Sequence, residues 1–470
     1  MDGNDKTLLV NRDVVILGFG SLGPAMLSAI FKSYLITPKQ ITIVADDDKN
    51  KQFAEQYSVD FVVEHIERAK INTQLKRIFA NKKNSVLINL SVTIGSGHLV
   101  DFCQENNILY IDSSFEIWAD QLNTSDMPSV AGCYNTLQRC KSKSSKGSTA
   151  ISCHGANPGM VSHFAKKLVH ILAEKELGPN IPIPKTSLEW SFLAQQLDIH
   201  TFIISEIDTQ CEIHTDVSSL YNTWSIQGFL QEAAEFPCFP FGTRAFSSDN
   251  QKYIKSVANM NYFEPNIASM LYHTLGYSPS YGIFEGMVIP HIEAFSMAKF
   301  FGHGLVNYAP TIYFCYRSCN GALNLAYDAM YNDWCEPEGA FVACDTLSKG
   351  IESLGILVLR HNKPAAWYGS EVSVREAKYL TNANATTMQV VGGLMSALCY
   401  ALTYPDQGVL EPEDLDTHFV LDVAKPYMGN MFFSYAHDPA RAKINPHLKH
   451  KLFDDFSAIK APNEGIIVDV

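Results

Sequence analysis

The sequence lacks the cysteine patterns of a disulfide scaffold or a zinc site. Its 11 cysteines contain no C-x-x-C pair, and the nearest two are Cys315 and Cys319. It also lacks an apolar run of the roughly 20 residues that span a bilayer, since the longest, residues 390–404, is too short. The first residues, MDGNDKTLLVNRD, carry acids where a signal peptide needs bases. We therefore expect a cytoplasmic protein with reduced thiols, no bound metal and no membrane contact.

Positive charge is scarce in this chain. The 36 lysines and arginines are outnumbered by 49 aspartates and glutamates, which leaves a net charge of −13. An acidic surface disfavours nucleic acid and favours cationic partners, although many proteins are acidic for solubility alone. Hydrophobic residues make up 46% of the 470 residues, so the chain has enough apolar surface for two or three domains.

Strand-like and helical patterns alternate over residues 1–150. Apolar runs rich in β-branched residues lie at 13–20, 40–47, 85–92 and 107–115, with helical spacing between them, as in PAMLSAIFKSYL. This alternation predicts an α/β domain built on a doubly wound parallel sheet, the Rossmann architecture.

The pattern changes after the basic segment QRCKSKSSKGS, residues 138–148, which we expect to be an exposed loop near a domain hinge. Residues 151–385 mix strands and helices less regularly, which predicts an α+β substrate domain with a mixed or antiparallel sheet. Residues 386–470 are expected to form C-terminal helices that partly pack back on the Rossmann domain. The first of these helices contains Gly392 and Gly393, which would let it approach another backbone closely.

The segment ILGFGSLGPAML contains a dinucleotide-binding pattern. Gly18, Gly20 and Gly23 form G-x-G-x-x-G after a predicted strand and at the start of a predicted helix, which is the context this pattern requires. Gly18 permits the tight turn, Gly20 lets the backbone approach a pyrophosphate, and Gly23 lets the helix pack close to the strand. The helix start at Ser21 and Leu22 would then face the phosphates with its N–H groups. The alternative is a glycine-rich turn without a ligand.

Three acids follow the second predicted strand. Asp46 lies 23 residues after Gly23, close to the spacing of the acid that bonds the adenosine ribose. The alignment also permits Ala45 at that point, with Asp46 or Asp47 bending back to the ribose. Because three carboxylates would repel a 2′-phosphate, we expect NAD rather than NADP as the cofactor.

Polar residues also follow two later strands, at the edge where a doubly wound sheet holds its cofactor. Asn89 and Ser91 follow one strand, and Asp112 and Ser113 end the next, with Glu116 among aromatic residues just beyond. Their side chains could bond the ribose or the nicotinamide. Ordinary polar turns at strand ends explain them equally well.

A second glycine-rich turn, ISCHGANPGMVSHF, opens the second region at residues 151–164. It lacks G-x-G-x-x-G and is therefore not a second phosphate site. Pro158 disfavours a helical backbone at Asn157, and Gly155 and Gly159 allow close approach on either side. We expect this turn to place the Asn157 amide, with Pro158, where the substrate domain meets the nicotinamide.

Acids in apolar surroundings mark the second region. Glu206 lies in a strand-like run, and His291 and Glu293 follow an apolar strand. Trp224 and Glu232 are eight residues apart and would lie about 80° apart on a helix. Each residue alone is explained as readily by a structural role. Together they suit an ammonium group and supply an imidazole that can move a proton, which predicts an amine oxidised at the carbon beside nitrogen.

Four segments, GANPGMVSHF, NTWSIQGFLQEAAEFP, GMVIPHIEAFSMAKFF and AAWYGSEVS, resemble the bacterial homospermidine synthases. The resemblance covers nearly the whole chain and implies a saccharopine dehydrogenase-like fold, bound NAD and a homodimer. It implies a transferase that oxidises putrescine to an imine, releases ammonia and adds a second putrescine. The same hydride, stored on NAD, then returns to give homospermidine. Spermidine can replace one putrescine, with diaminopropane as the by-product.

The resemblance also implies roles for individual residues. Trp224 would hold an ammonium group by a cation–π contact. Glu206 and Glu232 would fix amine groups, one of them sharing proton transfer, and His291 would lie beside the reacting carbon. Asn157 would contact both the cofactor and the substrate. Glu116 and Glu293 would contact the substrate.

A net oxidoreductase of the saccharopine or carboxyspermidine dehydrogenase kind is the alternative. Such enzymes bind a substrate carboxylate and need an arginine or lysine beside it, whereas acids surround the motifs here. A non-enzymatic NAD-binding sensor is a third interpretation, for which no cluster of acids and aromatics is needed.

Overall fold

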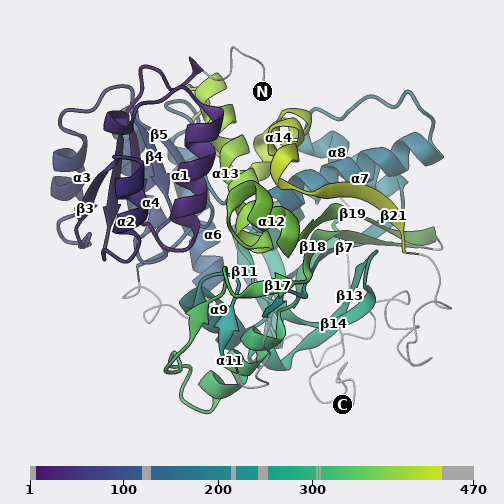
Figure 1. Ribbon diagram of the computed structural model, residues 1–470. Helices are drawn as coiled ribbons and strands as arrows, with labels where there is room; N and C mark the ends of the chain where they lie inside the picture. The colour runs from purple at the N-terminus through teal and green to yellow at the C-terminus, as the bar shows by residue number, and fades with distance from the viewer. Residues whose placement is uncertain are drawn as a thin grey trace. The chain divides into compact units, whose positions relative to one another are not determined.

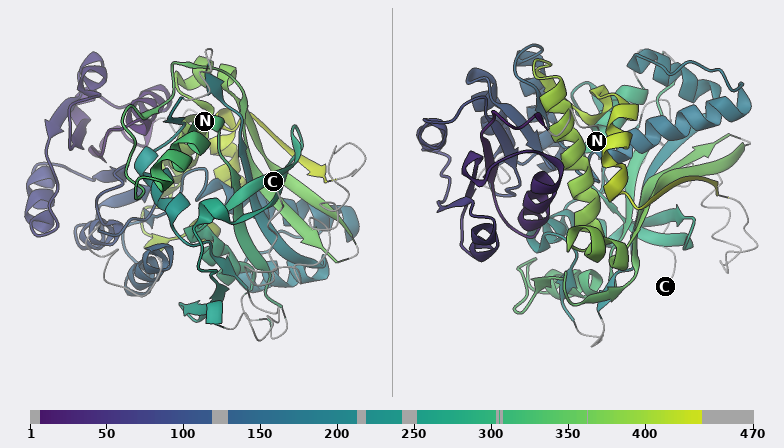
Figure 2. Two further views of the ribbon diagram at one scale, coloured as in Figure 1. Left: turned by 90° about the horizontal axis from the view of Figure 1, so that it is seen from below. Right: turned by 45° about the horizontal axis from the view of Figure 1, so that its top comes forward.

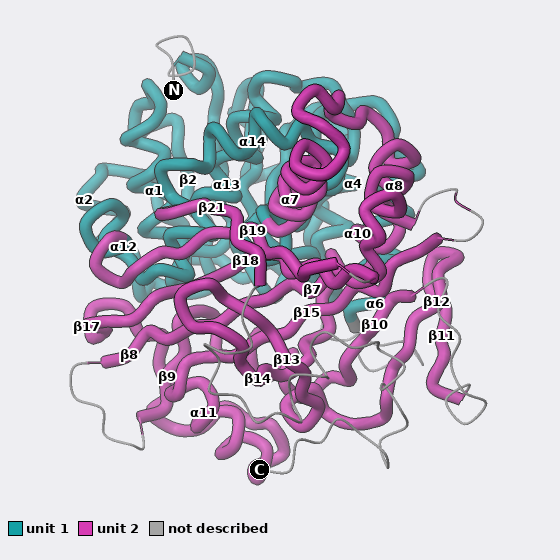
Figure 3. Tube along the Cα trace, turned by 90° about the vertical axis from the view of Figure 1, so that its right-hand side faces the viewer, with its two compact units in different colours: residues 1–160, 377–428 teal, residues 161–376, 429–470 magenta. Residues whose placement is uncertain are grey.

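The computed structural model comprises two compact units, coloured separately in Figure 3. The first unit contains residues 1–160 and 377–428, and the second contains residues 161–376 and 429–470. The structure describes residues 7–118, 129–212, 219–241, 252–302, 305, 308–361 and 363–436. The end of the predicted C-terminal helical region, residues 437–470, lies outside these ranges.

The first unit is built on a seven-stranded sheet, which confirms the predicted Rossmann-like architecture. All of its neighbouring strands are parallel, in the order β20-β6-β5-β4-β1-β2-β3. The strands are β1 (Val14–Leu17), β2 (Ile41–Ala45), β3 (Asp60–Val63), β4 (Val86–Asn89), β5 (Leu109–Asp112), β6 (Ala150–Ile151) and β20 (Val409–Leu410). The central strands β1, β4 and β5 are buried at every residue, as parallel strands covered on both faces are.

Helices connect the parallel strands, and Figure 1 shows the first four around the purple and blue strands. The helices of this unit are α1 (Leu22–Ser33), α2 (Lys51–Gln56), α3 (Ile71–Phe79), α4 (Ser96–Glu105), α6 (Ser129–Lys143), α13 (Ala385–Thr403) and α14 (Thr417–Ala424). Helix α12 (Val374–Thr381) crosses from one unit into the other along the chain.

The prediction of an exposed loop over residues 138–148 is wrong for its first half. Helix α6 continues to Lys143, because lysine and arginine are good helix formers and the serines do not interrupt it. Lys141 on this helix is paired with Glu411 and Asp414 at 2.7 and 2.5 Å. The basic residue therefore joins two segments of the first unit that are far apart in the sequence.

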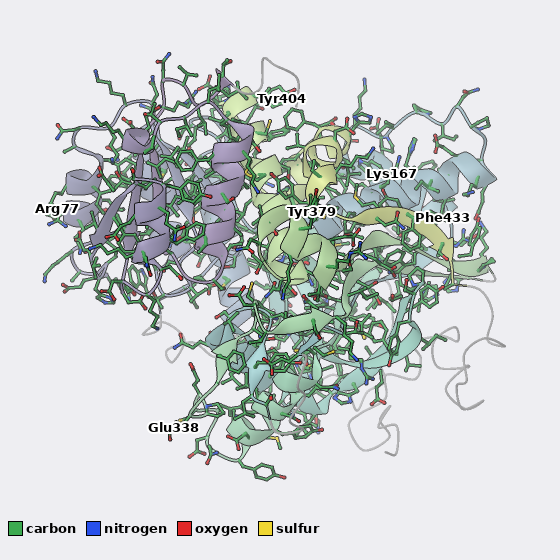
Figure 4. All side chains as sticks on the ribbon, in the orientation of Figure 1. Arg77, Lys167, Glu338, Tyr379, Tyr404 and Phe433 are labelled. Atoms are coloured by element: carbon green, nitrogen blue, oxygen red, sulfur yellow. The ribbon has the colours of Figure 1, made fainter. Side chains whose placement is uncertain are left out.

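Helix α13 is the central helix of the first unit. It contacts α1, β5 and α14, and Tyr404 at its end, labelled in Figure 4, packs on Phe419 of α14 with ring centroids 5.9 Å apart. Among the described residues it alone is long and apolar enough to cross a membrane, but 89% of that window is buried in the structure. Burial of this degree is what a core helix of a folded domain shows.

The two glycines of α13 allow the close approach expected from the sequence. A Cβ at Gly393 would lie 2.1 Å from the carbonyl oxygen of Gly155, and one at Gly392 would lie 2.5 Å from the Met428 side chain. The carbonyl of Gly393 is in turn 3.0 Å from Nδ1 of the buried His154. Helix α13 thus holds the glycine-rich turn at 154–159 in place.

Replacing Gly393 by alanine should therefore destabilise the protein by about 1–3 kcal/mol, because backbone has to move to make room for the methyl group. The measurement is the free energy of unfolding from denaturant titration. Gly132→Ala in α6 is the matched control, because its Cβ would meet only Ile117 at an ordinary 3.7 Å. Gly132→Ala should be neutral or stabilising. Equal effects of the two substitutions would contradict this packing.

The second unit contains a mixed seven-stranded sheet, as predicted. The strand order is β13-β14-β15-β7-β18-β19-β21, and only the β15–β7 pair is parallel. The strands are β7 (Ile199–Asp208), β13 (His273–Ser278), β14 (Gly282–Ile289), β15 (Thr311–Arg317), β18 (Ile351–Arg360), β19 (Lys363–Ser373) and β21 (Asn430–Tyr435). Residues 430–435 thus form a strand in a region where we expected helices. Figure 2 shows the long twisted strands from two further sides.

Shorter elements surround this sheet. Its helices are α7 (Met160–Glu176), α8 (Ser187–Gln196), α9 (Ile226–Ala234), α10 (Ile292–Phe301) and α11 (Asn320–Met330). Three small sheets are formed by β10 (Phe239–Pro240), β11 (Ile254–Val257) and β12 (Met260–Phe263), by β8 (Cys211–Glu212) with β17 (Leu347–Lys349), and by β9 (Tyr221–Asn222) with β16 (Phe341–Val342).

The two faces of the mixed sheet carry different residues, because side chains alternate along a strand. On one face Ile203 and Ile207 of β7 join an apolar core that includes Tyr313 of β15. The residues that alternate with them along β7 point to the opposite face. That face includes Glu206 and Asp208 at the end of β7, so acidic side chains lie on a buried surface of the second unit.

Candidate active site

The glycine-rich loop after β1 has the geometry of a phosphate site. Gly18 has a φ of +83°, and a Cβ there would lie 2.8 Å from the Ser91 backbone nitrogen. A Cβ at Gly20 would meet no atom within 4 Å, so open space lies beside its backbone. At Gly23 the close neighbour is the ring of Phe19 at 2.5 Å, rather than the strand backbone. The loop is therefore closed on the protein side and open where a pyrophosphate would approach.

The start of α1 can present backbone N–H groups to an anion, although the Gly23 N–H donates to the Gly20 carbonyl at 3.3 Å. Ser21 is the N-cap residue and makes no capping hydrogen bond with its side chain, and Leu22 is the first helical residue. Asn50 donates to the carbonyls of Phe19 and Gly20 at 3.0 and 3.1 Å. Because carbonyl and N–H point in opposite directions across a peptide plane, the N–H groups of Gly20 and Ser21 point away from Asn50. These features fit the diphosphate of a dinucleotide.

The acids after β2 differ in how they are engaged. Asp47 accepts from the Lys49 backbone at 3.1 Å and pairs with the Lys49 ammonium at 3.2 Å, so its carboxylate is turned to its own loop. The neighbouring backbone hydrogen bond lowers the pKa of Asp47. Asp46 directly follows the strand and lies 3.4 Å from Nδ1 of His65 on an exposed surface. Of the alternatives left open by the sequence, Asp46 is thus better placed to bond a ribose.

The polar residues at the ends of β4 and β5 form one buried hydrogen-bond chain. Asn89 donates to the Tyr110 hydroxyl at 3.2 Å, and that hydroxyl donates to Asp112 at 2.6 Å. The side-chain oxygen of Asn89 accepts from the Ser91 backbone at 3.2 Å. Burial raises the pKa of Asp112 to about 8, although the hydrogen bonds it accepts lower it. These side chains stabilise the edge of the sheet.

Asp112 also holds the second glycine-rich turn. Its carboxylate accepts from the Cys153 backbone at 2.6 Å, and its carbonyl accepts from the His154 backbone at 2.9 Å. Ser113 lies beside this turn, 3.2 Å from the position that a Cβ of Gly155 would take. The bond between Asn157 and Pro158 is a cis peptide, and Asn157 is half-buried. The first residues of the turn, 153–155, are thus held by β5 and by α13.

Glu116 lies beyond β5 at the start of a segment that packs on α4. Its backbone N–H donates to the Ser96 hydroxyl at 3.0 Å, and its carbonyl accepts from the Ser96 N–H at 3.0 Å. Its side chain is half-buried in the first unit. The contacts of Glu116, Ser113, Asn157 and Pro158 with a cofactor or substrate stay predictions.

In the second unit the structure brings His291, Glu293 and Glu232 together. His291 is the N-cap of α10, and its Nδ1 lies 2.5 Å from Glu293 in the first turn of the same helix. Its Nε2 faces Glu232 of α9 at 3.8 Å. His291 is 8% exposed and Glu293 1%, so both are withdrawn from bulk water. Glu232 is half-buried and is the more accessible carboxylate.

The electrostatics of this cluster favour a protonated imidazole. Burial lowers the pKa of His291, but the charge and hydrogen bond of Glu293 outweigh it, and the charges of Glu232 and Glu206 add to the effect. The pKa rises to about 9 as a result. At neutral pH the ring is therefore a cation, able to give up a proton from Nε2. Oε1 of Glu293 is buried and has no hydrogen-bond partner among the described residues.

Trp224 is held just outside α9, which corrects the helical geometry assumed for it. Ser225 is the N-cap and accepts from the Gly228 backbone at 3.1 Å, so Trp224 precedes the helix. Its ring packs edge-on against Phe229 with centroids 5.9 Å apart, the contact that often fixes the entry into a helix. The indole N–H donates to the Tyr316 hydroxyl at 3.2 Å.

Three buried residues next to this cluster were missed in the sequence. Tyr316 lies opposite Glu206 in the parallel β15–β7 register, and Glu352 lies opposite Asp208 in the antiparallel β18–β7 register. Asp208 accepts from the Thr223 hydroxyl and from the Gln210 backbone, both at 2.7 Å. The signal for Asp208 was its place two residues after Glu206 in SEID, which puts both on one face of a strand. No local signal marks Tyr316 or Glu352.

This face of the second unit suits a cationic amine. Glu206, Asp208 and Glu352 are buried carboxylates, and burial raises the pKa of Asp208 to about 6 against the hydrogen bonds that lower it. An ammonium group would offset the repulsion between them. The same surface offers an aromatic ring and an imidazole, so it can bind an amine and move a proton at its nitrogen.

Two family models match the chain in succession. Residues 14–151 match the saccharopine dehydrogenase NADP binding domain, and residues 155–432 match the saccharopine dehydrogenase C-terminal domain.

Three relatives extend this likeness over most of the chain. The homospermidine synthase of Mesorhizobium japonicum is 30% identical over 436 residues, which is 89% of this chain and 89% of the relative. That of Blastochloris viridis is 29% identical over 435 residues, 89% and 90% of the two chains. The crystal structure of the Legionella pneumophila homospermidine synthase in complex with NAD has a TM-score of 0.83 and 30% identity, covering 94% and 95% of the two chains. The chain, which matches both saccharopine dehydrogenase domains, therefore belongs to the homospermidine synthase family.

Proposed function

We propose that this protein is an NAD-dependent homospermidine synthase that transfers an aminobutyl group from one putrescine to a second. One carbon–nitrogen bond breaks and one forms, so two putrescines give homospermidine and ammonia without net oxidation. Spermidine can serve in place of one putrescine, with diaminopropane as the by-product. The observation that carries the proposal is the His291–Glu293–Glu232 cluster beside Trp224 in a chain of this family.

The first unit fits NAD as the cofactor. The open space beside Gly20 and the uncapped start of α1 suit the diphosphate, and Asp46 suits the adenosine ribose. The family model of this domain is named for NADP, but the three acids at 46–48 would repel a 2′-phosphate. The Legionella relative was solved with NAD. Bound NAD supplies an acceptor for the hydride at the amine-bearing carbon and returns that hydride at the end.

The residues of the second unit bind the amine and move its protons. The buried Oε1 of Glu293 and the carboxylates of Glu206 and Glu232 accept hydrogen bonds from ammonium groups, and Trp224 offers its ring face to one of them. The second putrescine adds to the imine carbon through a neutral amine before the first nitrogen leaves. Protonated His291 gives its Nε2 proton to the departing nitrogen and so helps ammonia to leave. The neutral ring then takes the proton released by the newly attached nitrogen. Asn157 and Glu116, in the first unit, keep the predicted roles of contacting cofactor and substrate.

We also propose a cytoplasmic homodimer that binds neither nucleic acid nor membrane. The 11 cysteines are thiols outside any disulfide in the structure, which suits a reducing compartment. The net charge of −13 opposes contact with nucleic acid, and the family resemblance supports a dimer. Sedimentation of the purified protein measures the oligomeric state.

The test of the proposed activity is a product assay. Purified protein is incubated with putrescine and NAD, and homospermidine, ammonia and free NADH are quantified together. Homospermidine and ammonia should appear in equal amounts while free NADH stays far below them. Stoichiometric NADH, or its consumption with a keto acid plus an amine, would instead identify a net dehydrogenase. NAD binding without conversion of any amine would also overturn the proposal.

A further inference from the structure

One polar contact holds the Trp224 indole in addition to its packing on Phe229. Trp224 precedes α9, so the helix does not set the direction of its ring, and the ring is only half-buried. Its Nε1–H donates to the Tyr316 hydroxyl at 3.2 Å. Together with the Phe229 contact, this hydrogen bond restricts the rotation that a half-buried ring would otherwise retain.

Tyr316 is itself rigidly held. It is 2% exposed in the middle of the mixed sheet, and its ring stacks on Phe314 with centroids 5.5 Å apart. Phe229 of α9 packs edge-on against it at 6.4 Å, and Phe229 also touches Trp224 at 5.9 Å. Tyr316 therefore connects β15, the third of the seven strands, to the aromatic ring that precedes α9.

The surroundings of the Tyr316 hydroxyl favour its neutral form. Burial raises its pKa well above the usual value, and the charges of Asp208, Glu352 and Glu206 raise it further. A neutral phenol both accepts the indole N–H and keeps its own proton. Accepting that bond draws the indole hydrogen toward oxygen and leaves the ring richer in electrons, which strengthens its attraction for a cation.

We propose that Tyr316 is a positioning residue for the amine, acting through Trp224 by orienting and polarising the indole ring. The inference rests on the proposed function, in which Trp224 faces an ammonium group. It adds a residue from the centre of the sheet whose contribution lies in substrate affinity rather than in the chemical step.

The first test is Tyr316→Phe, which removes the hydroxyl and keeps the ring. The KM for putrescine at saturating NAD should rise about 3- to 10-fold, the effect of losing one hydrogen bond in a buried site, while kcat changes less than about 2-fold. Tyr313→Phe is the matched control, because it makes the same change on the same strand but on the opposite, apolar face. Its KM should equal that of the wild type. An unchanged KM in Tyr316→Phe would overturn the proposal.

A double-mutant cycle separates positioning from general packing. Trp224→Phe keeps an aromatic face but lacks the indole N–H, so Tyr316→Phe should have no further effect on KM in that background. Additive effects of the two substitutions would contradict the proposed route through Trp224. The indole N–H signal of Trp224 in ¹⁵N-tryptophan NMR, assigned by its absence in Trp224→Phe, should shift in Tyr316→Phe and stay in place in Tyr313→Phe.

The outcomes distinguish this proposal from the proposed function. If the wild type makes no homospermidine, the proposed function fails, whatever the NMR signal shows. If the wild type is active and Trp224→Phe raises the KM while Tyr316→Phe does not, only the role of Tyr316 is overturned.

Discussion

Replacing His291 by alanine is expected to lower kcat/KM for homospermidine formation by about 10²- to 10⁴-fold, the range for loss of a general acid–base group. The buried ring lies between two carboxylates, and its Nε2 faces the more accessible one. The rate is measured by quantifying homospermidine at low putrescine concentration.

His361→Ala provides the control for this substitution. His361 is exposed in the same unit and stacks on His200 with centroids 4.4 Å apart, away from any acid of the cluster. Its loss should leave the rate within about 2-fold, as expected for a surface change. A His291→Ala rate within 3-fold of the wild type would remove the imidazole from the chemistry.

The pH dependence of kcat/KM provides a second test of the role of His291. Because Glu293 is the largest of the charges that raise the pKa of His291 to about 9, Glu293→Gln should move that pKa toward its usual range. The cation is then lost at lower pH, so the alkaline fall of kcat/KM should begin at lower pH in the variant. Putrescine titrates identically in both assays, so the difference between the two profiles reports the enzyme group. Superimposable profiles would contradict the pairing.

Replacing Gly20 by valine is expected to abolish most NAD binding without unfolding the protein. A Cβ at this position would meet no atom within 4 Å, so we expect the fold to accommodate the valine, which would fill the space beside the loop. Loss of two hydrogen bonds to a charged diphosphate costs about 3 kcal/mol, which corresponds to about 100-fold in affinity. Titration calorimetry with NAD measures the loss.

The thermal midpoint without NAD is the control for Gly20→Val and should stay near that of the wild type. Gly18→Val is the informative contrast. Gly18 has a positive φ, and its Cβ would meet the Ser91 backbone at 2.8 Å, so this variant should lose stability as well as binding. If Gly20→Val binds NAD within 3-fold of the wild type, the loop is not the phosphate site.

Features that depend on neighbouring residues could be predicted from the sequence. The strand, glycine turn and helix at residues 14–33 follow one another directly, so one motif predicts all three. His291 and Glu293 are two residues apart, and an apolar strand with a helix after it places both at one helix start. The close approach of α13 was visible in its adjacent glycines, although the sequence did not name Gly155 as the neighbour.

Features that depend on strand register could not be predicted in the same way. Tyr316 and Glu352 reach Glu206 and Asp208 only through pairings between strands more than 100 residues apart in the chain. The alternation in SEID would have indicated Asp208, but not which residues lie opposite. The spacing of Trp224 and Glu232 was judged as if both lay on a helix, whereas the Ser225 cap makes Ile226 the first helical residue and leaves Trp224 outside. Local capping decided the geometry at that position.

The central claim is that one hydride leaves putrescine and returns to the same carbon, and isotope retention tests it most directly. Putrescine carrying deuterium at both amine-bearing carbons, four deuterium atoms in all, is converted in the presence of unlabelled NAD and excess unlabelled NADH. Mass spectrometry then counts the deuterium in the product. We expect homospermidine that retains all eight deuterium atoms of two putrescines, with no label in the free NADH. Homospermidine with seven, together with deuterium in free NADH, would contradict the account.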